Sequence, residues 1–439
     1  MSHSLFLNTK PSKLFWRTAI PGGISMVASS LYGLFESILV GKILGTTAFA
    51  AISFSFPIIV INFSLAELIG VGSSVPISIF LGQKKEEKAN NYFTCSILLT
   101  IITGLLSGGL IFFGAPTLLR MLGAEGEMLN YCVTYLRIYA ISSPITPLMY
   151  SLDNYLRISG KIKSSMMLNI FFCVFSIGLE WIFLRFIIKD VSGAAFGTII
   201  AMTVCIIISV VMFLPGKLQL KFVRPRFSFD MIKQIYKNGI APFLTNISGR
   251  LFSFVMNGML LLFGGEAAVA VYGVVMTLCG VVEQMIYGTI DSLQPAIGCN
   301  YGAGRYDRIK TLEKYVLASA ATISLVFGSV IFLFPEAATK LFLEDVSLLD
   351  MAVGAVKITC LTFIFKWFAT AVQCFFMALE KPASAMVISI ASACAFPLAL
   401  IPALLPMKLT GLWWNYPLST ILAAGLALVI IVKQKNKLF

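Results

Sequence analysis

The chain has 439 residues, of which 58% are hydrophobic and only 12% are charged, and its mean hydropathy is +0.90. Soluble domains carry about 25% charged residues, so this composition excludes an ordinary soluble protein and indicates a polytopic membrane protein. The net charge of +13 could suggest a nucleic-acid partner, but its distribution along the chain indicates membrane topology, and no nucleic acid is expected.

Apolar segments of helix length predict an all-α protein with twelve transmembrane spans. They lie near 14–40, 48–81, 92–119, 129–156, 165–188, 194–214, 232–263, 268–299, 311–334, 350–378, 384–405 and 411–432. With these spans, 23 of the 33 Lys and Arg residues fall on the side of the two termini, six fall on the other side and four lie within spans. Cytoplasmic loops carry the excess of Lys and Arg, so both termini are expected on the cytoplasmic side of a cell (inner or plasma) membrane. Residues 1–13 are short and polar, and no cleavable signal peptide is expected.

The histidine and cysteine residues of this sequence form no pattern typical of a metal site, a catalytic triad or a disulfide framework. The single histidine is His3, and the nine cysteines lie singly in or beside apolar segments. A histidine-based metal site and a Ser-His-Asp triad are therefore excluded. We expect no enzymatic activity, no cofactor and no disulfide framework.

The first span carries two residues that are unusual in a membrane helix. Pro21 lies near its start and Glu36 lies well inside it. A carboxylate at membrane depth costs about 2.5–3.5 kcal/mol, so such a residue is usually buried within the bundle and functional. Proline removes a backbone donor and bends the helix, so Pro21 is expected to act as a hinge. A bendable helix with a titratable group indicates a transporter.

Further acidic residues follow within the expected spans. Glu180 lies in the fifth span, and two carboxylates brought together in a low-dielectric lobe cannot both stay ionised at low cost. Glu36 and Glu180 are therefore candidates to bind a proton or Na+. The other membrane acids either line a substrate cavity or pair with cationic residues within the spans. The acids are Glu67, Asp153, Glu283 and Asp291, and the cationic residues are Arg137, Arg250, Lys357 and Lys366.

An internal repeat organises the chain into two halves. An offset of about 220 residues aligns Pro21 with Pro242, Gly45 with Gly265, and Gly160-Lys161 with Glu380-Lys381. Six spans per half make the repeats parallel, an arrangement known from transporters. We expect an N-lobe at 1–214 with spans one to six, a cytoplasmic linker at 215–230, and a C-lobe at 231–439 with spans seven to twelve.

The sequence resembles the multidrug and toxic compound extrusion (MATE) family over essentially its whole length. The resemblance rests on Pro21, Glu36 and Val40-Gly41 in the first span, and on the helix exits Gly70-Val-Gly-Ser-Ser…Leu81-Gly-Gln-Lys-Lys and Leu156-Arg157-Ile-Ser-Gly160-Lys. The most specific stretch is Gln294-Pro295-Ala-Ile-Gly-Cys-Asn300-Tyr301-Gly302-Ala303 in the eighth span. This last motif is expected to form a kink and a helix exit.

The resemblance implies a V-shaped transporter of two six-helix lobes, with alternating access to a central cavity. It implies export of organic cations or other amphiphiles in exchange for H+ or Na+. The family's N-lobe cation site would fall on Glu36, Glu180, Thr198 and the backbone carbonyl of Ala194. Asp291 is the best cavity candidate among the other acids because it lies mid-span in the helix of the most specific motif.

The sequence departs from the family pattern at several of these positions. Glu36 and Glu180 stand where the family usually has Asp, and Ser176 stands where it has Asn. The longer side chains favour H+ over Na+ as the coupling ion, although Na+ stays possible at this pair. Lys366 and Gln373 occupy the tenth span where some members have an acid, so a cation site in the C-lobe is not expected.

Three alternatives remain to be weighed against a cation-coupled exporter. A lipid-linked oligosaccharide flippase of the same superfamily would have similar lobes with a more basic cavity, and the four cationic residues within spans keep it open. A passive channel is disfavoured because a two-lobe repeat with a hinged acidic helix suits alternating access. A membrane-embedded enzyme lacks a set of catalytic groups. The expected partners are drug-like or cationic small molecules and the lipid bilayer, with the protein acting as a monomer.

Overall fold

The computed structural model describes residues 2–214, 216, 218–343 and 346–438, and this part is built of helices without β-strands. Eight helices are long and apolar enough to cross a membrane, or nine if the bent pair Leu349–Ile364 and Lys366–Ala378 is one span. Two of the eight, Phe229–Gly302 and Pro382–Gln434, each run over two of the expected spans. The predicted all-α polytopic fold is therefore confirmed.

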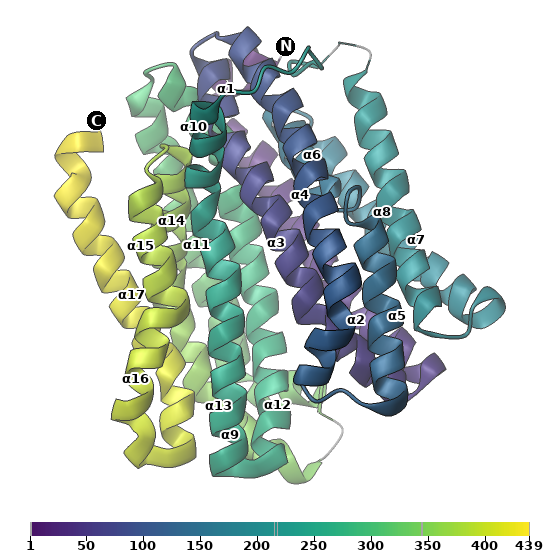
Figure 1. Cartoon of the computed structure of the whole chain (residues 1–439). Coiled ribbons are helices and arrows are strands. Elements are labelled where there is room, and N and C mark those ends of the chain that lie inside the picture. Colours follow the sequence, from purple (N-terminus) through teal and green to yellow (C-terminus); the bar gives the residue numbers. More distant parts are fainter. Residues whose placement is uncertain (1, 215, 217, 344–345, 439) are drawn as a thin grey trace. The chain divides into compact units, whose positions relative to one another are not determined.

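The chain forms two compact units, and two long helices contribute to both. Unit 1 comprises Met1–Thr9 and Ala28–Phe243, and unit 2 comprises Lys10–Val27 and Leu244–Phe439. One boundary lies within α2 (Pro11–Leu44) and the other within α9 (Phe229–Asp291). Both helices are labelled in Figure 1. The lobes proposed from the sequence divide the chain in the linker instead, and they stay a prediction.

Besides its parts of α2 and α9, unit 1 contains α1 and the helices between α2 and the linker. They are α1 (Ser2–Asn8), α3 (Thr46–Gly82), α4 (Glu86–Met121), α5 (Gly126–Ser142), α6 (Leu148–Ile158), α7 (Ile162–Ile182), the π-helical turn η1 (Phe183–Ile187) and α8 (Val191–Phe213). The expected fourth span is divided into α5 and α6 because Pro144 and Pro147 interrupt the helix with turns. The pairs α3–α4, α4–α5 and α7–α8 pack against each other, and α7 and α8 carry most of the candidate site.

The linker is held against α4 by side chains. Asn90 and Thr94 accept hydrogen bonds from the backbone N–H groups of Lys221 and Val223 at 2.9 and 3.1 Å. Asn91 makes two such bonds with the backbone of Arg226, accepting from its N–H at 2.8 Å and donating to its carbonyl at 2.9 Å. This side-chain support lets the irregular backbone keep its polar groups satisfied.

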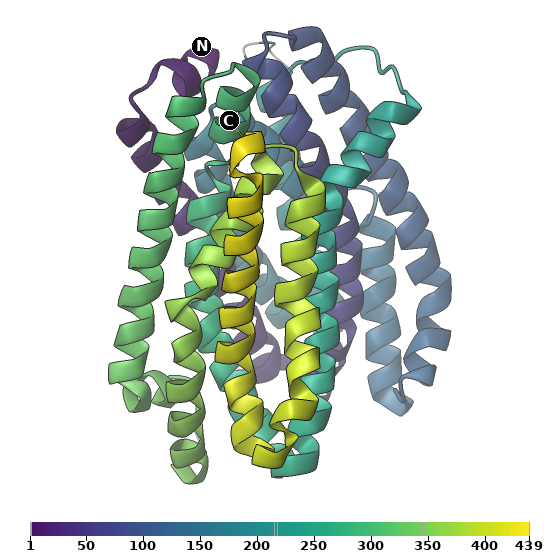
Figure 2. The same cartoon turned by 90° about the vertical axis from the view of Figure 1, so that its left-hand side faces the viewer.

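Unit 2 continues from α9 to the C-terminal helix. Its elements are α10 (Gln294–Gly302), α11 (Tyr306–Leu333), α12 (Pro335–Lys340), η2 (Val346–Leu348), α13 (Leu349–Cys360), η3 (Leu361–Ile364), α14 (Lys366–Ala378), α15 (Pro382–Ile390), η4 (Ala391–Ala395), α16 (Phe396–Leu404), η5 (Leu405–Met407) and α17 (Lys408–Leu438). Figure 2 shows α17, in yellow, beside α15 and α16, both of which it contacts. Two turn residues, Ser292 and Leu293, separate α9 from α10, and Pro295 lies in the first turn of α10; the kink expected there stays a prediction.

Backbone conformation repeats between the two halves of the chain. Left-handed φ angles occur at Gly45 and Gly265 (86° and 66°), at Lys84 and Gly304 (62° and 68°), and at Gly160 and Glu380 (77° and 55°). Each pair is separated by 220 residues, the offset found in the sequence. Since a left-handed residue marks a specific turn, the same turns connect corresponding helices in both halves.

Candidate cation-binding site in unit 1

Three helices of unit 1 bring polar side chains around one buried carboxylate. Glu180 of α7 is fully buried, and it lies one turn after Ser176 on the same helix face. Thr198 comes from α8 and Tyr32 from α2. The approach of α8 depends on Gly197, because a Cβ there would lie 2.7 Å from the backbone nitrogen and the Cγ atom of Glu180.

The Glu180 carboxylate is asymmetric in its hydrogen bonding. Its Oε1 atom accepts from the hydroxyls of Tyr32 at 2.9 Å, Ser176 at 2.9 Å and Thr198 at 2.8 Å. Its Oε2 atom is buried and has no hydrogen-bond partner among the described residues. Because buried polar atoms are nearly always paired, an unpartnered carboxylate oxygen is the natural place for a proton or a monovalent cation.

The hydroxyl groups around Oε1 are also linked to one another. The Tyr32 and Thr198 hydroxyls lie 3.1 Å apart, and the Thr198 hydroxyl lies 3.2 Å from the carbonyl oxygen of Ala194. Each hydroxyl has a single proton, so a donor that turns away from Glu180 has a second acceptor available. The expected residues Ser176, Glu180, Thr198 and Ala194 are therefore brought together.

Glu36 lies one helical turn after Tyr32 on α2 and is half-buried. It is close enough to Glu180 for the two charges to interact, and close enough to Tyr32 for a hydrogen bond. The hydroxyl of Tyr139 adds a further polar group near Glu36 and Thr198. The pair of carboxylates proposed from the sequence therefore lies within one cluster of hydroxyl groups.

Two other acids have cationic partners. Asp153 forms an ion pair with Arg157 at 3.1 Å, and its other oxygen accepts from Ser165 and Asn169. Arg157 is buried, whereas the sequence pattern predicts that the chain leaves the membrane at this residue. The cationic partners proposed from the sequence do not include Arg157. Glu283 pairs with Lys366, one of the partners considered.

The remaining predicted residues lie elsewhere. Asp291 is buried at the end of α9 and Glu67 lies within α3. Pro21 lies inside α2, which stays helical through it, and α2 passes from unit 2 to unit 1 between Val27 and Ala28. The transition is thus less than two turns from the proline.

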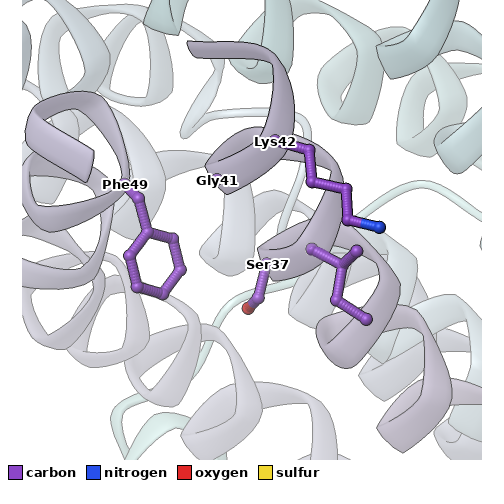
Figure 3. Close-up of a pocket in the computed structure, with 5 residues that line it drawn as sticks. Ser37, Gly41, Lys42 and Phe49 are labelled. Carbon is purple, nitrogen blue, oxygen red and sulfur yellow. The ribbon is translucent and has the colours of Figure 1, made fainter. Parts of the chain in front are cut away.

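A shallow cavity of about 230 Å³ lies further along α2, beyond Glu36. Ser37, Ile38, Gly41 and Lys42 of α2 and Phe49 of α3 line it (Figure 3). It contains none of the acidic residues of the cluster, and within the described part of the chain no group of three or more His, Cys, Asp or Glu residues could hold a metal ion.

Sequence reasoning did not identify Tyr32 and Tyr139. Tyr32 precedes Glu36 by one helical turn, so an i, i+4 search from the membrane acid would have found it. Tyr139 comes from α5, and its proximity to Glu36 depends on how α5 packs, for which the sequence gives no indication.

Comparison with known proteins places this arrangement in context. The family model MatE matches residues 21–182 and 242–402, one segment in each half. The multidrug export protein MepA of Staphylococcus saprophyticus is 26% identical over 429 residues, covering 96% of this chain and 93% of that protein. MepA of Staphylococcus haemolyticus is 26% identical over 434 residues, covering 97% and 94%.

The fold is also similar to solved structures. A MOP superfamily transporter from Pyrococcus furiosus, described as having a binding pocket of reverse polarity that suggests a different function, gives a TM-score of 0.94 at 22% identity. The similarity covers 100% of this chain and 98% of that one.

Proposed function

The chain belongs to the MatE family of transporters, and from this premise we propose that it is a secondary active multidrug exporter. It exports organic cations and other amphiphiles across a cell membrane in exchange for H+ or Na+, by alternating access. The membrane location follows from the apolar helices, and the export activity is that of the MepA relatives, which are multidrug export proteins. Cytoplasmic termini and a monomeric state complete the proposal.

The proposed coupling site is assigned mainly from the geometry of the Glu180 carboxylate. Three hydroxyls fix Oε1, and Oε2 is left without a partner in a fully buried position. This arrangement orients the carboxylate in advance, so that a proton or Na+ arriving at Oε2 meets a fixed oxygen. Glu36 supplies the second carboxylate, and with Ser176, Thr198 and the Ala194 carbonyl it provides the oxygen atoms that a Na+ ion would need.

The path of α2 suggests how ion binding is transmitted. Glu36 and Tyr32 lie on the part of α2 that belongs to unit 1, whereas Pro21 lies on the part that belongs to unit 2. Binding of a cation removes the repulsion between Glu36 and Glu180 and draws the unit 1 part of α2, which carries Glu36, towards α7. Pro21 lacks the backbone donor that would stiffen the helix, so α2 bends there and the two parts move separately.

The four other membrane acids are proposed contributors to a substrate cavity, where negative charge attracts cations. Asp153 and Glu283 form ion pairs with Arg157 and Lys366, and Asp291 is buried at the end of α9 beside the most specific family motif. The same Lys366 pair weakens the flippase alternative, since a basic cavity needs cationic side chains that are not neutralised. The guanidinium carbon of Arg137 lies 5.2 Å from the centroid of the Phe112 ring, so this cationic side chain contacts an aromatic ring.

Efflux of a fluorescent organic cation from proteoliposomes tests this function. A pH gradient and a Na+ gradient are imposed separately on the same preparation. We expect the pH gradient alone to drive uphill transport, because Glu in place of the family's usual Asp favours H+ over Na+ at this pair. A strict requirement for Na+ would assign the cluster as a Na+ site, and no response to either gradient would contradict coupled export and favour the flippase.

A further inference from the structure

One carboxyl group of unit 2 lies on the buried face of its helix. The buried residues Ile309, Leu312, Val316 and Ala320 recur along α11 at helical spacing, and Glu313 lies in the middle of that stripe. Glu313 is only 8% exposed, whereas the next residue of α11 faces outward. The register of the helix therefore forces this side chain into the interior.

The Glu313 carboxyl is not compensated by a neighbouring group. Its Oε1 atom is buried and has no hydrogen-bond partner among the described residues. Glu313 forms no ion pair with another described residue, and it is only 8% exposed. An ionised carboxylate in such surroundings costs several kcal/mol unless it is paired, so the surroundings of Glu313 favour its protonated form.

Glu313 faces a small set of other buried polar groups. The thiol of Cys374 on α14 interacts electrostatically with both Glu313 and Asp291, and it lies within hydrogen-bond reach of the Gln294 side chain. Gln294 and Asp291 are 8% and 6% exposed, and the Nε2 atom of Gln294 has no partner among the described residues. The helices α9, α10, α11 and α14 thus carry buried polar groups, and Glu313 and Gln294 each have a buried atom without a hydrogen-bond partner among the described residues.

Apart from Asp291 of α9, the described charged residues on the elements packed against α11, Asp350 of α13 among them, are exposed or already paired. Lys366 at the start of α14 is paired with Glu283, and Lys357 on α13 is exposed. The two charged residues of α12, Glu336 and Lys340, are exposed and follow the opposite end of α11. On α10 and η3 there is no charged residue.

We propose that Glu313 is a second proton-binding site of this protein, loaded in the conformation described here and exchanged when water reaches its buried carboxyl group. The site lies in unit 2, shares no residue with the cluster around Glu180, and does not depend on the function proposed for that cluster. A proton fits better than a metal ion, because one carboxyl, one amide and one thiol offer too few oxygen ligands. Polar groups with unused hydrogen-bonding capacity also favour the entry of water.

Infrared difference spectroscopy on the reconstituted full-length protein tests the proposal. The carbonyl-stretch band of protonated carboxyl groups is compared between mildly acidic and alkaline buffer, in a Glu36→Gln/Glu180→Gln background that silences the other cluster. We expect a titrating band that Glu313→Gln removes and that the exposed-site control Glu336→Gln retains. An unchanged difference spectrum in Glu313→Gln would overturn the proposal.

A second variant keeps the test valid if Glu313→Gln fails to fold. Glu313→Asp keeps the carboxyl group, and we expect it to shift the titrating band in frequency without removing it. A band that does not move in this folded variant would also overturn the proposal. Because the background lacks Glu36 and Glu180, failure of coupled efflux at that pair leaves the outcome at Glu313 unaffected.

Discussion

Tyr32 is the residue through which α2 reaches the Glu180 carboxylate. Its hydroxyl donates to Oε1 at 2.9 Å, while its ring packs against Phe172 at a centroid distance of 5.2 Å. The ring contact with Phe172 positions the Tyr32 side chain, and the hydroxyl stabilises the ionised carboxylate of Glu180. These two contributions can be separated by substitution with phenylalanine.

Tyr32→Phe should shift the pH dependence of efflux towards alkaline values by about one unit. A hydrogen bond to a charged group contributes about 1.5–3 kcal/mol, and about 1.4 kcal/mol corresponds to one pH unit. Loss of this donor destabilises the ionised carboxylate, so the proton is held to higher pH. The measurement is the initial efflux rate in proteoliposomes over a pH series.

Tyr131→Phe is the matched control, since its hydroxyl also donates to a glutamate, Glu127, but at an exposed position. A surface hydrogen bond of this kind should not affect coupling. Equal pH profiles for Tyr32→Phe and wild type would show that the hydroxyl does not act on the coupling site.

The candidate site could be predicted from the sequence in its charged residues but not in its full set of partners. Glu36 and Glu180 are identified by the cost of a carboxylate in the membrane, and Ser176 is identified only through the resemblance to the MATE family. Tyr139 lies on another helix, and hydroxyl groups carry no comparable cost, so nothing in the sequence separates it from a core tyrosine. The burial of Arg157 was missed because a cation after a span usually marks its exit, whereas here Asp153 pairs with it.

At the scale of helices, the contact of α7 with α8 determines whether the site forms. Gly197 lets α8 approach the backbone of Glu180, since a Cβ at this position would lie 2.7 Å from two of its atoms. Small residues at such crossings allow close helix packing in membranes. The hydroxyl of Thr198 reaches Glu180 only at this separation.

Gly197→Ala should therefore displace α8 and abolish coupled efflux. Overpacking of this kind costs about 1–3 kcal/mol, which would be measured as a lower thermal unfolding temperature in detergent. Gly178→Ala on α7 is the control, because a Cβ there meets nothing within 4 Å. Normal efflux and unfolding in Gly197→Ala would contradict the packing argument.

A second element-scale prediction concerns the linker. Asn91→Ala removes both hydrogen bonds to the backbone of Arg226, each worth about 0.5–1.5 kcal/mol. We expect faster hydrogen exchange of the amides in 218–228, measured by mass spectrometry. The exposed residue Lys88 on the same helix provides the control, as Lys88→Ala, and unchanged exchange in Asn91→Ala would mean that other contacts hold the linker.

At the scale of the whole molecule, the internal repeat connects sequence and structure most directly. The 220-residue offset predicted from prolines and glycines recurs in three pairs of left-handed backbone positions. Turns are local features, and their chemistry is visible in the sequence. The division of α2 and α9 between the two units was not predicted, because it depends on which helices each part packs against, and hydropathy carries no information on that choice.

The division of α2 between the two units is central to the proposed transport mechanism. The proposed coupling carboxylates, Glu36 and Glu180, lie in unit 1, and Glu36 is carried by α2, whose N-terminal part belongs to unit 2. Cation binding at Glu36 and Glu180 is proposed to drive export through this helix. Neutral side chains of the same shape at these positions should leave the fold intact and remove the driving force.

The most direct test is uphill efflux of a fluorescent organic cation, driven by a pH gradient, from proteoliposomes that contain wild type, Glu36→Gln or Glu180→Gln. Glu336→Gln serves as the control for loss of an exposed carboxylate. On the proposed function, wild type and Glu336→Gln should concentrate the cation against its gradient, and the other two variants should fold normally but fail to concentrate it. Uphill transport at the wild-type rate in Glu180→Gln would contradict it.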